Sequence, residues 1–161
     1  MTTTHQFTGT ATLYSDDTQF EKKVGLEISF RARFDPPVWR VRAADFKPVE
    51  LADVESGGRK FDLVVTLDED AKGSYDVTTG ALSIFTVFEF NPDLPLVPSS
   101  DLKITLDGGS YTLRPGAEVR GSPYDKTTGA LSLAGIGTFV SGTLRDTRCA
   151  IQLDGVFKPQ P

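Results

Sequence analysis

Four arginines in one short segment are the residues whose types and spacing most readily predict chemistry. They occupy alternate positions on either side of Asp35-Pro36-Pro37, with Arg31 and Arg33 before it and Arg40 and Arg42 after it. Alternation of period two is typical of strands, and a proline ends a strand because it cannot donate a ladder hydrogen bond. We therefore expect a hairpin that gathers four guanidinium groups on one face, able to bind carboxylate, sulfate or phosphate. The alternative is a solvated face whose arginines pair with carboxylates.

A second candidate is the run of residues 84–90, which is apolar on both strand faces except at Glu89. Such a strand is either central in a covered sheet or next to an apolar cavity. A buried Glu89 would have a raised pKa and serve as a general acid or base, whereas at the strand end it would reach water. We expect Trp39, Phe88 and Phe90 to supply apolar contacts to a ligand, with Arg40 or Arg42 as its anion anchor.

Several common chemistries are disfavoured by residues that the chain lacks. His5 is the only histidine and Cys149 the only cysteine, so histidine-based nucleophile systems, thiolate metal clusters and intrachain disulfides are not expected. The acidic turns lack EF-hand spacing, and no glycine-rich phosphate loop is present. We predict no metal and no cofactor. Whether the protein is an enzyme stays open, leaning toward no, with Glu89 the one catalytic candidate.

The elements that position these residues are strands throughout. Alternating apolar and polar residues recur along the chain, for example over 24–34 and 61–67, and no segment keeps a 3.6-residue apolar period over helical length. The pattern predicts an all-β antiparallel fold of roughly nine to eleven strands, either a β-barrel or a two-sheet β-sandwich. We expect one domain over residues 1–161, with residues 1–6 and 158–161 as frayed tails.

One phrase occurs twice in the chain. Residues 75–83 read YDVTTGALS and residues 124–132 read YDKTTGALS, and each copy is followed by an Ile-x-Leu-Asp-Gly segment. This order predicts a duplicated strand-hairpin-strand unit, over about 61–108 and about 109–155. Asp76 and Asp125 are expected to accept backbone hydrogen bonds in a turn, and Gly80 and Gly129 to adopt the left-handed conformation. The phrase therefore predicts a generic hairpin turn rather than a site.

Charge and hydropathy limit the partners. The net charge of −5 disfavours nucleic acid, and no apolar run approaches the length of a membrane span. The first residues have neither the basic start nor the apolar core of a signal peptide, so we expect a cytoplasmic protein, with secretion by another route left open.

Two functional hypotheses follow. The first is a β-module that binds an apolar or amphipathic, optionally anionic, small molecule, with a histidine-independent cyclase or isomerase as its enzymatic variant. The second is a structural or adhesive β-module that self-associates or binds glycans, and a homo-oligomer is compatible with either. A pocket above roughly 300 Å³ lined by aromatic residues favours the first, and a filled interior favours the second.

Overall fold

The fold is built from strands, as the alternation predicted. The computed structural model describes residues 2–16, 22–56, 59–93, 96–142 and 144–160, and within them the side chains of 22–25, 53–56 and 59 are not described. These residues form twelve strands and one 3-10 helix: β1 Thr3–Ser15, β2 Lys22–Asp35, β3 Val38–Val41, η1 Ala43–Asp45, β4 Val49–Ser56, β5 Arg59–Leu67, β6 Ala71–Tyr75, β7 Leu82–Pro92, β8 Ser100–Leu106, β9 Ser110–Arg114, β10 Ala117–Arg120, β11 Ala130–Phe139 and β12 Arg148–Pro159. In the described ranges there is no helix long and apolar enough to cross a membrane.

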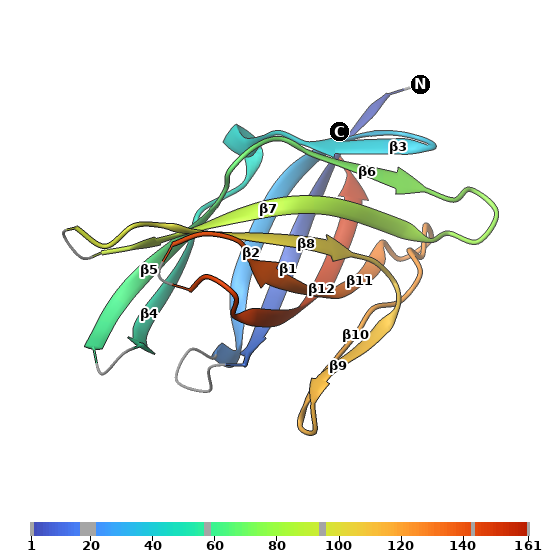
Figure 1. The fold of residues 1–161 in the computed structure, drawn as a ribbon. Helices are drawn as coiled ribbons and strands as arrows, with labels where there is room; N and C mark the ends of the chain where they lie inside the picture. The colour runs from blue at the N-terminus through green and yellow to red at the C-terminus, as the bar shows by residue number, and fades with distance from the viewer. Residues whose placement is uncertain (1, 17–21, 57–58, 94–95, 143, 161) are drawn as a thin grey trace.

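Eight of the strands close into an antiparallel barrel, which decides between the barrel and the sandwich. The ring runs β1–β2–β3–β6–β7–β8–β11–β12 and returns to β1 (Figure 1). Closure leaves none of these eight strands as an edge over its paired length. An eight-stranded barrel has an interior just wide enough for side chains to fill, and that is where the main hydrophobic core lies.

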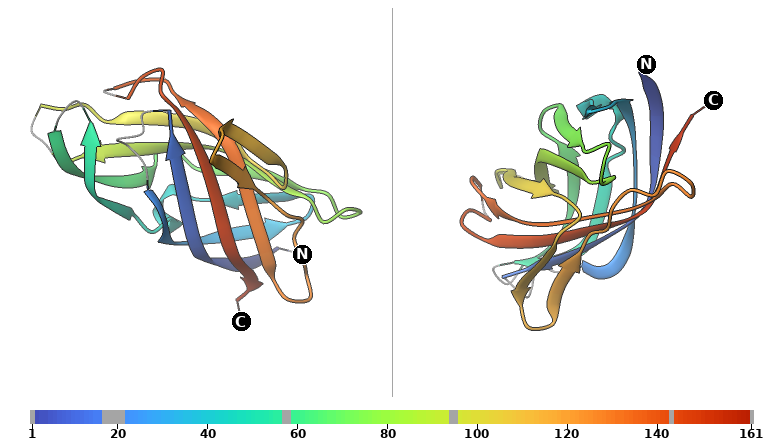
Figure 2. Two further views of the ribbon diagram at one scale, coloured as in Figure 1. Left: turned by 90° about the horizontal axis from the view of Figure 1, so that it is seen from below. Right: turned by 90° about the vertical axis from the view of Figure 1, so that its right-hand side faces the viewer.

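Two hairpins extend the barrel. β4 and β5 continue the sheet beyond β7, where residues 63–67 of β5 pair with residues 88–92 of β7. β9 and β10 form a separate two-stranded sheet that projects from the barrel (Figures 1 and 2). Leu113, Ala117 and Val119 of this hairpin pack on Ala134 of β11 and Ala150 of β12, forming a small second core outside the wall. The small alanine side chains let the hairpin approach the barrel closely.

The two copies of the repeated phrase form the same turn, as predicted. In each copy the aspartate Oδ1 accepts hydrogen bonds from the backbone N–H groups two and three residues ahead, at 2.8–3.3 Å. Gly80 and Gly129 have φ of 78° and 81°. The strands before the turns differ, because β6 lies in the barrel whereas β9 and β10 lie outside it. The duplication itself stays a prediction.

The chain ends differ from the expected frayed tails. β1 begins at Thr3 and pairs with β12, with His5 opposite Pro159 and Gln6 opposite Lys158. His5 is therefore only 4% exposed, and its ring lies 4.7 Å from the Phe34 ring and 4.8 Å from the Phe157 ring. These rings belong to an aromatic cluster that fills one end of the barrel. Residues close to a terminus are ordered here because a distant strand supplies their hydrogen bonds.

Candidate functional site

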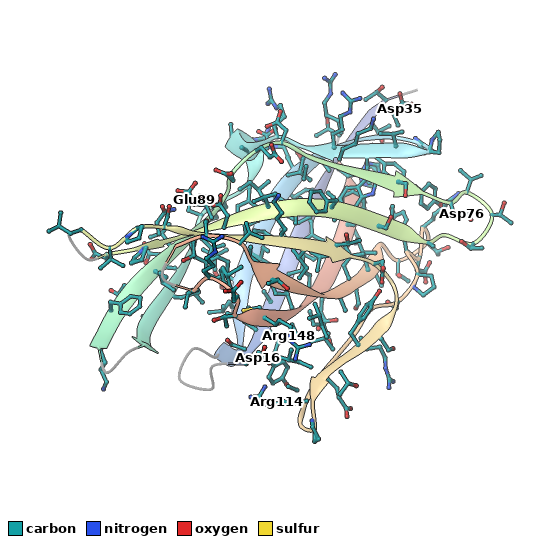
Figure 3. The ribbon with its side chains drawn as sticks, viewed as in Figure 1. Asp16, Asp35, Asp76, Glu89, Arg114 and Arg148 are labelled. Carbon is teal, nitrogen blue, oxygen red and sulfur yellow. The ribbon has the colours of Figure 1, made fainter. Side chains whose placement is uncertain are left out.

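The outer wall of β2 and β3 carries the four arginines that the alternation identified. The apolar residues between them are buried in the barrel, and Arg31, Arg33, Arg40 and Arg42 are all exposed. Asp35, labelled in Figure 3, is the last residue of β2, and its neighbour Phe34 pairs with Thr3 of β1. The structure thus brings these arginines to one outer surface and places none of them in the barrel interior.

Strand pairing places two of these arginines and a lysine in a line across three neighbouring strands. Arg33 of β2 lies directly opposite Arg40 of β3, and Arg40 lies directly opposite Lys72 of β6. Side chains directly opposite one another on adjacent strands have Cβ atoms about 4.5–5.5 Å apart. We call Arg33, Arg40 and Lys72 the cationic row. Lys72 was not identified from the sequence, because its place in the row depends on the pairing of β3 with β6.

The cationic row differs from its neighbour Arg42 in how its charge is balanced. Arg42 donates a 2.8 Å hydrogen bond to Asp45, and this bond and the charge of Asp45 raise the pKa of Arg42. Within the part of the chain that the structure describes, no carboxylate forms an ion pair with Arg33, Arg40 or Lys72. Like charges directly opposite on a sheet are destabilising. The fold therefore carries an uncompensated cost at this row.

A hollow in the surface adjoins the row. It measures about 450 Å³ and is lined by Arg33 and Arg40 together with Thr2 and the turn residues 35–38. Asp35 is the acidic member of this lining, and it already takes part in an interaction of its own. The hollow is large enough for a small oxyanion or the charged end of a larger ligand, with two guanidinium groups on its wall.

The aromatic candidates lie on the other side of the barrel wall. Trp39 is fully buried, and its indole N–H donates to the carbonyl oxygens of Ser74 and Ser83 at 3.2 and 3.1 Å. Phe88 and Phe90 are buried beside two small interior cavities, of about 40 and 20 Å³. Phe88 borders both cavities, and Phe90 borders the larger one. The structure does not bring these residues together with Arg40 or Arg42, since alternate residues of one strand face opposite sides. The cavities are also far smaller than the roughly 300 Å³ expected of a pocket for a drug-sized ligand.

Comparison with known proteins adds no relative. No family model, curated protein or solved structure matches this chain. Its function must therefore be argued from its own geometry.

Glu89 lies on the outer wall of β7 in a group of three carboxylates. Glu89, labelled in Figure 3, is directly opposite Asp101 of β8. One carboxylate oxygen of each of Asp68, Glu89 and Asp101 lies within 4.8 Å of the others. Partial burial raises the pKa of Glu89, and a hydrogen bond with Asp68 and the charges of Asp68 and Asp101 raise it further. Burial and Asp68 likewise raise the pKa of Asp101. The three groups can share a proton or converge on a cation, and their geometry alone does not select a metal.

Thr86 is a polar residue that was not identified from the sequence, because it lies within an apolar run. Its side chain is 4% exposed and lines the smaller interior cavity. In the described residues, Thr86 Oγ1 and Tyr75 Oη are the buried side-chain polar atoms without a hydrogen-bond partner. The sequence feature that could have identified it is a hydroxyl at an inward position of a strand whose other inward residues are Leu, Ile and Phe.

Proposed function

We propose that the protein is a binding module that holds an anionic ligand on the outer wall of the barrel, at the cationic row. The observation that carries this proposal is the register that sets Arg33 opposite Arg40, and Arg40 opposite Lys72, with no ion pair to a carboxylate among the described residues. Placing cations opposite one another costs stability, and local conflicts of this kind are expected where a site is retained for function. An oxyanion removes the conflict by accepting hydrogen bonds from two or three cations at once.

Geometry supports a phosphate or sulfate ligand. Arginine presents a planar fork of N–H donors that fits the oxygens of such groups in a bidentate manner, and lysine adds a point charge. The adjoining hollow supplies space for the group beside Arg33 and Arg40. The proposal assigns binding and no reaction.

Calorimetric titration with inorganic pyrophosphate and with sulfate tests the proposal. Arg40→Gln removes the central cation, and since a hydrogen bond to a charged group contributes about 1.5–3 kcal/mol, affinity should fall about tenfold or more. Arg120→Gln is the control with the same change in net charge, because Arg120 is an exposed residue of β10, outside the barrel. It should bind both anions as the native protein does.

A second readout separates a ligand site from general attraction of anions. Arg40→Gln should raise the free energy of unfolding by about 0.2–1 kcal/mol, because it removes repulsion between directly opposite side chains. Asp35→Asn should strengthen binding, because it removes a negative charge from the hollow. Equal affinity in the Arg40→Gln and Arg120→Gln variants, or no saturable binding at millimolar anion, would refute the proposal.

A further inference from the structure

Two small cavities lie inside the barrel and share part of their lining. The outer cavity, of about 40 Å³, is bordered by residues near the β4–β5 end of the barrel, including Leu13, Leu26 and Leu51. The inner cavity, of about 20 Å³, is bordered by Trp39 and Thr86 among others. Three apolar side chains line both cavities: Phe46, Phe88 and Leu153. The cavities are thus neighbours in one apolar interior, and of the three shared side chains only that of Phe46 does not belong to a strand.

Phe46 is placed to open this division. It follows η1 on the connection from β3 to β4, and its ring packs against the rings of Phe30 and Phe88, with centroids 6.4 and 5.8 Å apart. Phe30 and Phe88 belong to the barrel wall, whereas Phe46 is attached to a connecting segment. Of the three side chains that the cavities share, Phe46 is therefore the one whose rotation would widen the passage between them without moving a strand of the ring.

Thr86, which lines the inner cavity, carries a hydroxyl that has no hydrogen-bond partner among the described residues. A buried hydroxyl that makes no hydrogen bond is costly, and a valine at position 86 would fill the same space without that cost. The other polar group bordering the cavity, the Trp39 N–H, already donates to two carbonyl oxygens. Thr86 Oγ1 is therefore free to bind a polar atom that enters the cavity.

The lining of the two cavities indicates which kind of molecule would carry the polar atom that pairs with Thr86. The described lining of both cavities contains no charged side chain, so a charged group would be buried without compensation. Together the cavities hold about five water-sized spheres, at roughly 10–15 Å³ each, and displacement of the Phe46 ring adds the volume of that ring. The space suits a slender molecule of about five to ten heavy atoms with one oxygen.

We infer that the barrel interior binds a small neutral aliphatic molecule carrying one hydroxyl or carbonyl oxygen, which pairs with Thr86. The molecule reaches Thr86 from the outer cavity past Phe46. This site lies inside the wall and is independent of the anion site proposed for the outer surface.

Trp39, the only tryptophan of the chain, lies in the wall of the inner cavity and reports on its contents. Titration of the native protein with 1-pentanol should give a saturable change in Trp39 fluorescence, and pentanoate, which carries a charge, should give none. Thr86→Val removes the hydroxyl with little change of shape and should weaken 1-pentanol binding about three- to tenfold, as expected for one hydrogen bond. Thr105→Val, on the exposed face of β8, is the matched control and should bind 1-pentanol as the native protein does.

Xenon separates the role of the hydroxyl from the existence of the cavity. Both the native protein and Thr86→Val should take up xenon, detected by shifts of leucine and isoleucine methyl resonances, because xenon needs only an apolar space. Phe46→Ala should increase 1-pentanol affinity. Equal 1-pentanol affinity in the native and Thr86→Val proteins would refute the assigned role of Thr86. Absence of a saturable response to both 1-pentanol and xenon in the native protein would refute the site itself, whatever the outcome of the anion titrations.

Discussion

The unpartnered hydroxyl of Thr86 makes a prediction about stability that needs no ligand. Replacing Thr86 with valine removes a buried polar atom that has no hydrogen-bond partner among the described residues. Leaving such a group unsatisfied costs about 1–3 kcal/mol. We expect Thr86→Val to recover the lower half of this range, about 1–2 kcal/mol, because the methyl group that replaces the hydroxyl is slightly larger and part of the gain is lost in adjusting its packing.

Urea unfolding followed by Trp39 fluorescence measures this change directly, since Trp39 is fully buried. A gain of about 1–2 kcal/mol corresponds to a rise in Tm of about 2–8 °C for a domain of this size. Thr105→Val, on the exposed face of β8, should change the free energy of unfolding by less than about 0.5 kcal/mol. If Thr86→Val instead destabilises the protein by 1 kcal/mol or more, the hydroxyl has a partner in solution and the reasoning is wrong.

Two further changes test the turn geometry and the carboxylate group. Gly80→Ala should destabilise the protein by about 1–2 kcal/mol, because φ is 78° and the new Cβ would lie 3.0 Å from the backbone oxygen of Tyr124. Gly116→Ala is the control, because φ is 86° but no atom lies within 4 Å of the new Cβ. It should cost less stability than Gly80→Ala in the same unfolding assay. An equal loss in both variants would show that the contact with Tyr124 carries no cost. The raised pKa of Glu89 means that the folded state holds its proton more tightly than the unfolded state, so stability from this group should rise as pH falls from neutral toward 4.5. Glu89→Gln should reduce that rise and stabilise the protein at neutral pH, and an unchanged pH dependence of unfolding would contradict the proton-sharing geometry.

The features that the sequence predicted well are those that depend on near neighbours. Strand alternation placed Arg33 and Arg40 on one face and Trp39 on the opposite face, because successive side chains of a strand point to opposite faces. It did not decide which of the two faces is the outer one. The repeated turn was predicted from the positions of Asp76 and Gly80, whose hydrogen bonds and φ are set within a few residues. These inferences needed no knowledge of which strands pair.

The features that the sequence missed depend on pairing between distant strands. Lys72 joins the cationic row only because β6 lies beside β3, and Asp101 meets Glu89 only because β8 lies beside β7. His5 was expected in a frayed tail, and the partner that orders it is the other end of the chain. Alternation also could not decide between a barrel and a sandwich, since both bury alternate residues and differ in whether the strands close into one ring or divide into two sheets.

The pairing of β1 with β12 has a consequence for synthesis of the chain. β1 is the first and β12 the last of the described strands in chain order, and the two pair with each other in the barrel wall. At about 5–20 residues per second, β1 waits roughly 7–30 s on the ribosome with one row of backbone N–H and C=O groups unpaired. The ring cannot close during that interval, and an open strand edge is a template for pairing with other chains. Translation speed and nascent-chain crowding should therefore influence the yield of this protein.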